Sequence, residues 1–218
     1  DAQESRGLGD VYKRQIQTYK LEKDNPHSLF SNTVTRITGD QNGHIYLLCN
    51  DGVAQLDLRT LQFKTLLVDH IQSIYYHDGL YIAKKNEIYL YNEKTGNFDL
   101  CYQLPGKNPE IYCLHSDGRY LWIGTTSEGV YRLKLDNQEL THPIETGNIT
   151  SIYEDSEKEL WIGSWENGLY CVKTDGTIIN FRHDTNNPHS ISSNFARACC
   201  EDNLGNIWIG TVSYTHLR

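Results

Sequence analysis

The chain has 218 residues, of which 38% are hydrophobic and 11% aromatic, so it contains enough apolar material for a packed core. Its formal net charge of −8 argues against a nucleic-acid partner, because a phosphate-binding surface needs a stripe of basic residues. No apolar run approaches ~18 residues, so we expect no membrane span in this chain.

The two ends of the sequence differ from the rest. Residues 1–15 and 212–218 resemble translated sequencing-adapter read-through, and we predict a disordered leader and a tail that both lie outside the fold. The chain contains no Met, so we expect it to be a fragment of a longer protein. The folded part is expected to span residues 16–211.

An aspartate returns about once in every ~40 residues, a period that is typical of propellers and other repeat folds. Its copies are Asp40, Asp78, Asp117, Asp155 and Asp202. They stand in tight turns, where we expect each carboxylate to accept hydrogen bonds from its own backbone rather than to bind a metal. A short run of apolar, aromatic and apolar residues follows each copy, which favours a strand buried on both faces.

Four short apolar runs separated by turn residues fill each period, for example at 34–38, 44–49, 52–58 and 63–68 in the first unit. Four strands per period is the pattern of a propeller blade. We therefore predict an all-β fold, an open β-propeller fragment in which half a blade at 195–211 follows four four-stranded blades. The four whole blades are predicted at 34–68, 71–102, 111–144 and 149–182.

The strongest copies of the repeat share a tryptophan and a glycine. Trp122, Trp161 and Trp208 are predicted to be buried equivalents, because identical positions in stacked units meet identical neighbours. The glycines that follow at the same spacing are Gly124, Gly163 and Gly210. The second unit lacks both residues in the run 80–83, so we expect this blade to pack less regularly.

Motifs of catalysis and metal binding are missing from the sequence. The six cysteines lack the CxxC spacing of zinc sites, and we find no glycine-rich phosphate loop and no nucleophile elbow. We therefore predict no catalytic residue, no metal and no cofactor in this chain.

In antiparallel blades, the turns between second and third strands lie on the same face of the propeller as the links between blades. The candidate ligand-binding residues lie on this face. Trp165 stands out because its counterpart in the third blade is Thr126, so we expect a loop residue rather than a core residue. An exposed indole can stack on a sugar ring while amides and carboxylates bind its hydroxyl groups. The predicted site is Trp165, Glu166, Asn167, Glu128 and His189. The alternative is that Trp165 packs on the edge of a neighbouring blade or on a partner domain.

The repeat resembles the two-component regulator propeller repeat, which combines an aspartate, a short turn, a Leu-Trp-Ile-Gly run and a Gly-Val-Tyr or Gly-Leu-Tyr run. The linkers 25–29 and 187–194, with their Asn-Pro-His-Ser motifs, resemble the entry segment of such sensors. The resemblance implies the periplasmic sensor region of a hybrid two-component system whose parent protein is a histidine kinase. It also implies an oligosaccharide ligand, and as partners the other blades and domains of the parent sensor, with homodimerisation as a further expectation.

Two other functional classes remain open at this point. A propeller-fold polysaccharide lyase or glycosidase would need two or more acid and base groups that converge near the propeller axis. A protein-interaction platform would need neither catalysis nor a sugar.

Overall fold

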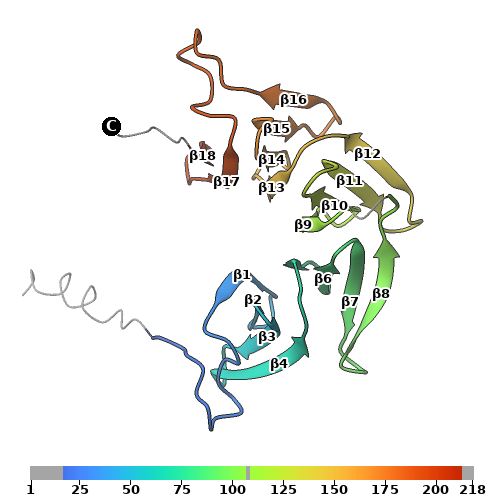
Figure 1. The fold of residues 1–218 in the computed structure, drawn as a ribbon, viewed down its shortest axis with the longest axis vertical. Helices are drawn as coiled ribbons and strands as arrows, with labels where there is room; N and C mark the ends of the chain where they lie inside the picture. The colour runs from blue at the N-terminus through green and yellow to red at the C-terminus, as the bar shows by residue number, and fades with distance from the viewer. Residues whose placement is uncertain (1–16, 107–108, 213–218) are drawn as a thin grey trace, which may run out of the picture.

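The computed structural model describes residues 17–106 and 109–212, and strands are the only regular structure in this part of the chain (Figure 1). The first two sheets contain β1 (Val34–Gly39), β2 (His44–Cys49), β3 (Gly52–Asp57) and β4 (Gln62–Val68), then β5 (Ser73–Tyr76), β6 (Leu80–Lys84), β7 (Glu87–Asn92) and β8 (Asn97–Gln103). The next two contain β9 (Ile111–Ser116), β10 (Tyr120–Thr125), β11 (Val130–Lys134) and β12 (Leu140–Ile144), then β13 (Ile149–Glu154), β14 (Leu160–Ser164), β15 (Leu169–Val172) and β16 (Ile178–Phe181). The last sheet contains β17 (Ala196–Glu201) and β18 (Ile207–Thr211).

The sheets are the blades of a propeller, as the sequence predicts. Within each sheet the strands pair antiparallel in chain order, and the five sheets follow one another around an open arc (Figure 1). The first strands of neighbouring sheets pack against one another, β1 on β5, β5 on β9, β9 on β13 and β13 on β17. These first strands therefore form the inner wall of the arc, and β4, β8, β12 and β16 lie on its outside. No helix in the described ranges is long and apolar enough to span a membrane.

Three of the hydrophobic clusters lie between neighbouring blades, and a fourth lies within the first blade and the linker before it. The side chains of Ile88 and Leu104 from the second blade pack with Leu121 and Ile123 from the third. A second cluster continues from the third blade to the fourth, where it includes Ile162. Because each blade is covered by its neighbour, the blades stabilise one another as stacked repeats do.

Two of the repeat glycines are required by the close approach of the next blade. A Cβ atom on Gly124 would lie 2.7 Å from Cγ2 of Ile149, and one on Gly163 would lie 2.8 Å from the carbonyl oxygen of Ala196. At Gly210 the nearest atom would be 3.7 Å away, an ordinary contact. The glycine of the repeat thus sets the spacing between blades where a following blade is present.

Four of the five repeated aspartates cap their turns as predicted, and three of them also hold the repeat tryptophans. The prediction is wrong for Asp78, whose exposed carboxylate caps no turn in the described part of the chain. Oδ1 of Asp117 accepts hydrogen bonds from the backbone N–H groups of Arg119 and Tyr120, which confirms the predicted turn cap. Oδ2 of the same residue accepts the indole N–H of Trp122 at 3.0 Å, a contact that the sequence analysis did not predict. The same bond recurs from Trp161 to Asp155 at 2.7 Å and from Trp208 to Asp202 at 2.8 Å.

The predicted burial of the three tryptophans is correct only for Trp122, which is 4% exposed. Trp161 is half-buried and stacks on Phe181 with ring centroids 5.9 Å apart. Trp208 is 63% exposed, so the prediction is wrong at this position. Among the described strands β18 pairs with β17 alone, and no further strand covers the indole.

Val212, the first residue of the predicted tail, is hydrogen-bonded to the last sheet. The N–H of Val212 donates to the carbonyl oxygen of Phe195 at 3.0 Å, and its own carbonyl oxygen accepts the hydroxyl of Ser193 at 2.9 Å. This residue therefore extends the pairing of β18 with β17, because its backbone groups find partners there. The predicted leader at 1–15 and the remainder of the predicted tail lie outside the described residues.

Candidate ligand site

Four of the five inner strands contain a β-bulge at the same place in the repeat. The register of each first strand against its second strand shifts by one residue, which leaves one residue without a partner in the ladder. A bulge turns the side chain of that extra residue away from the regular alternation and often stands beside a functional site. The four bulged residues are Thr35 in β1, Tyr112 in β9, Thr150 in β13 and Arg197 in β17.

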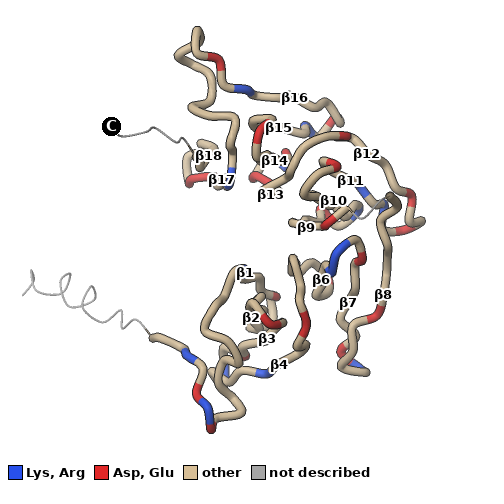
Figure 2. The backbone as a smooth tube through the Cα atoms, in the orientation of Figure 1, with Lys and Arg blue, Asp and Glu red and all other residues tan. Residues whose placement is uncertain are grey.

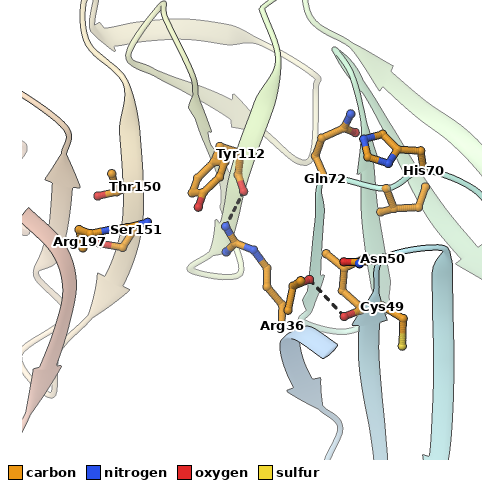
Figure 3. A pocket seen from close by; sticks show the side chains of 12 residues that line it. Arg36, Cys49, Asn50, His70, Gln72, Tyr112, Thr150, Ser151 and Arg197 are labelled. Atoms are coloured by element: carbon orange, nitrogen blue, oxygen red, sulfur yellow. Dashed lines mark hydrogen bonds between the residues drawn. The ribbon is translucent and has the colours of Figure 1, made fainter. Parts of the chain in front are cut away.

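All four bulged residues line one cavity of about 520 Å³, which we call the axial cavity because the inner strands surround it. The second blade has a regular first strand and contributes residues from the link before it instead. The remaining lining residues that Figure 3 labels are Arg36, Cys49, Asn50, His70, Gln72 and Ser151. The site therefore combines hydroxyl, amide, aromatic and guanidinium groups from all five blades.

Arg36 reaches across the axial cavity from the first blade to the third. Its Nη2 atom donates a hydrogen bond of 2.8 Å to the carbonyl oxygen of Tyr112, as Figure 3 shows. The guanidinium carbon also lies 4.9 Å from the centroid of the Tyr112 ring, within the range of a cation–π contact. Residues that are distant in sequence are thus fixed relative to each other at the wall of the cavity.

Arg197 is held by the tryptophan that the sequence analysis singled out. Its guanidinium carbon lies 5.2 Å from the ring centroid of Trp165, which stands in the turn between β14 and β15. The indole also packs edge-on against Phe195, with ring centroids 5.5 Å apart. The backbone N–H of Trp165 donates to the carbonyl oxygen of Asn148. Trp165 therefore packs at the junction of the fourth and fifth blades and supports a residue of the axial cavity.

The other four predicted binding residues have separate surroundings. Glu128 accepts a hydrogen bond of 2.6 Å from the hydroxyl of Tyr131. Glu166 is exposed in the turn of Trp165, and the N–H of Asn167 donates to the hydroxyl of Ser164 at 2.9 Å. His189 is exposed in the second linker. In the described ranges none of the five predicted residues lines the axial cavity, although Trp165 contacts one that does.

The two Asn-Pro-His-Ser linkers share one local structure. In the second linker the N–H of His189 donates to Oδ1 of Asn187 at 3.0 Å, and the hydroxyl of Ser190 closes the loop by accepting the N–H of Asp184 at 3.0 Å. The first linker has the same bonds, and the carbonyl oxygen of its His27 accepts the N–H of Phe63 in β4. Each linker is thus a loop closed by its own hydrogen bonds, and the bond to Phe63 holds the first linker on an outer strand.

The sequence analysis missed Arg36, Arg197 and the bulged positions, although one signal for the bulges is present. The bulged residue stands five positions before the repeated aspartate. The repeat has threonine there twice, as Thr35 and Thr150, and otherwise Tyr112 and Arg197, so three residue types of different size and charge occupy the position. A position that varies within an otherwise regular repeat indicates a binding role rather than a packing role.

Comparison with known proteins shows what kind of repeat this is. Residues 143–166 and 190–213 match the family model of the two component regulator propeller. The chain carries two-component regulator propeller repeats. A comparison with curated proteins found no match.

Solved structures support a propeller fold along most of the chain. The extracellular domain of BT3049 of B. thetaiotaomicron, described as a hybrid two component system, is 24% identical with a TM-score of 0.76, and the match covers 89% of this chain and 28% of that one. The extracellular domain of BT4673 from the same organism is 22% identical with a TM-score of 0.71, covering 86% and 27%. PorZ, a surface component of the type-IX secretion system of Porphyromonas gingivalis, is 15% identical with a TM-score of 0.64, covering 82% and 31%. This chain therefore spans less than a third of the length of each.

The axial cavity of the regulator propeller is suited to binding a polar ligand. Hydroxyl and amide groups can both donate and accept hydrogen bonds, and guanidinium groups donate several. Burial raises the pKa of the Cys49 thiol in the wall, so this sulfur is protonated at neutral pH and is a poor nucleophile. In the described part of the chain no group of three or more His, Cys, Asp or Glu residues is arranged to hold a metal ion.

Proposed function

We propose that this chain is the ligand-sensing propeller of an extracytoplasmic receptor of the hybrid two-component type. In this proposal it binds an oligosaccharide in the axial cavity, and the signal passes to a histidine kinase outside this chain. The observation that carries the proposal is the set of bulged, variable residues around one cavity, on a regulator propeller scaffold.

The size and chemistry of the axial cavity support a saccharide ligand. Small-molecule sites typically occupy ~300–1,000 Å³, and the cavity of about 520 Å³ falls in this range. Its wall offers the amides of Asn50 and Gln72 to the hydroxyl groups of a sugar. The ring of Tyr112 adds an aromatic surface of the kind that sugar rings contact.

The arrangement of blades suggests how binding could become a signal. The cavity wall comes from five blades that touch mainly through packed side chains, so a ligand contacts several rigid units at once. A ligand can shift an equilibrium only by its differential affinity for two states. A ligand that bridges blades favours the spacing of blades that it fits best, and further domains of the receptor would respond to that spacing.

The proposed location and partners follow from the same family. A periplasmic site is supported by the descriptions of BT3049 and BT4673 as extracellular domains. The proposed partners are the remaining blades and domains of the receptor, and a second copy of the receptor in a homodimer.

Titration of the receptor ectodomain that contains this chain with a panel of oligosaccharides tests the proposal, with chromatography of the same samples to detect products. We expect saturable binding without turnover. Thr35→Trp should abolish binding because the indole fills the cavity, while Thr95→Trp, the same change in the exposed hairpin between β7 and β8, should leave it unchanged. Product formation would instead support a glycosidase or lyase, and absence of any saccharide binding would support an interaction platform.

A further inference from the structure

The charged residues around the axial cavity differ in sign from the chain as a whole. The chain contains 28 Asp and Glu residues against 20 Lys and Arg residues, and Figure 2 shows both kinds scattered over the sheets. The charged side chains in the wall of the axial cavity, as far as the structure describes it, are both arginines, Arg36 and Arg197. Other clefts of the molecule include carboxylates, such as Asp57, Asp69 and Asp117.

Resting on the proposed function, we infer that the ligand of the axial cavity is an acidic saccharide, whose carboxylate or sulfate groups bind Arg36 and Arg197. A guanidinium group presents five N–H donors in a planar fork that matches such oxyanions. Arg36 uses one of its N–H donors in the hydrogen bond to the carbonyl oxygen of Tyr112. Arg197 lies over the face of the Trp165 indole. Most donors of both groups are therefore available to a ligand.

Neither arginine is neutralised by the protein itself. In the part of the chain that the structure describes, no carboxylate lies within ion-pair distance of Arg36 or Arg197. Arg36 is half-buried and has lost part of its hydration, which an opposite charge on a ligand compensates, whereas Arg197 is exposed and free to meet such a charge. This arrangement favours a ligand that brings the missing anions.

Both guanidinium groups are also positioned before a ligand arrives. Arg36 is half-buried and fixed by a hydrogen bond and a ring contact, and Arg197 rests on Trp165, which is itself packed on Phe195. Groups that are already ordered lose less entropy on binding. The two arginines stand in walls formed by the first and fifth blades, so acidic groups spaced along one oligosaccharide can reach both.

The test compares three probes on the ectodomain that contains this chain: a uronic-acid trisaccharide, its methyl-esterified form and a sulfated oligosaccharide. The inference predicts at least a tenfold lower Kd for an acidic probe than for the neutral ester, a difference of about 1.4 kcal/mol. The difference should shrink as salt is raised, because screening weakens charge attraction. Preference for the sulfated probe over the uronate would identify sulfate as the anionic group.

Variants locate the anion in the axial cavity. Arg36→Gln and Arg197→Gln should each weaken binding of the acidic probe by tenfold or more, a larger loss than either causes for the neutral ester. Arg132→Gln is the matched control, because Arg132 also stacks on an aromatic ring, that of Tyr120, but lines a different cleft. Thermal melting shows whether each variant is folded. The salt series uses the unmodified protein, so it tests the inference even where a variant fails to fold.

The outcomes separate this inference from the proposed function. Equal binding of the ester and the acid, with no effect of either arginine variant, would overturn the inference and leave an oligosaccharide sensor intact. Failure of every saccharide to bind would contradict both.

Discussion

The third and fifth blades contain the same repeat, yet their tryptophans meet opposite surroundings. Trp122 and Trp208 donate the same hydrogen bond to the repeated aspartate, at 3.0 and 2.8 Å. Trp122 is 4% exposed because the fourth blade packs on the third, whereas Trp208 is 63% exposed. The turn and its hydrogen bond are therefore properties of the local sequence, and burial is a property of the neighbouring blade.

The largest expected effect is a difference in the free energy of unfolding between two Trp→Ala variants. Trp122→Ala should lower the free energy of unfolding by about 3–5 kcal/mol, because it empties a packed site between blades. Trp208→Ala should change it by less than about 1 kcal/mol, because the indole is mostly in water. Chemical denaturation of the two variants measures both values. Equal losses would show that Trp208 is covered in solution and that the comparison is false.

The repeat glycines provide a second test of the same comparison. Gly124→Ala should cost about 1–3 kcal/mol, because the new methyl group collides with Cys113 and Ile149 in a filled space. Gly210→Ala should be nearly neutral, since its methyl group finds only ordinary contacts. Thermal melting of the pair is sufficient to rank them. A tolerated Gly124→Ala would mean that the third and fourth blades can move apart easily.

A smaller effect is expected from pH, through His115 in β9. This imidazole lies between Tyr75 of the second blade, at 3.1 Å, and Glu154 of the fourth, at 3.4 Å. Burial lowers the pKa of His115 below its usual value of 6.5, despite the nearby carboxylate. The unfolded chain then binds the proton more tightly than the folded one. Stability is therefore unaffected well above pH 6.5 and falls as the pH drops below it.

The histidine prediction has a direct control. Between pH 7 and pH 5 the unmodified protein should lose stability more steeply than His115→Gln, which keeps a hydrogen-bonding side chain but cannot be protonated in this range. Denaturation midpoints at each pH give the two slopes. Parallel slopes would assign the acid sensitivity to other groups. The equivalent positions in the fourth and fifth blades are Tyr153 and Cys200, so the effect belongs to the third blade and not to the repeat.

Most of the fold was predictable because its signals are local. The period of the aspartates, the turn residues and the short apolar runs lie within a single unit, so the number and order of strands follow from the sequence alone. The exposure of Trp208 was not predictable in this way, because it depends on which strands cover β18.

The candidate site was less accessible to sequence reasoning. A β-bulge is a mismatch between two paired strands, and the residues around Thr35 or Tyr112 read as ordinary alternating strand. The contact from Arg36 to Tyr112 joins the first blade to the third, and nothing in either segment indicates the other. Trp165 stands in a turn, as predicted, and contacts Arg197 of the axial cavity, whereas the other predicted residues lie elsewhere.

The bulge also separates two roles within each repeat. Residues of the ladder and the repeat aspartates hold the unit together, whereas the single bulged residue has no partner residue in the ladder and lines the axial cavity. A change at that one position alters the wall of the cavity while the strands keep their register. Duplication of such units followed by divergence at one codon per unit can therefore produce propellers whose cavities have different walls on an unchanged scaffold.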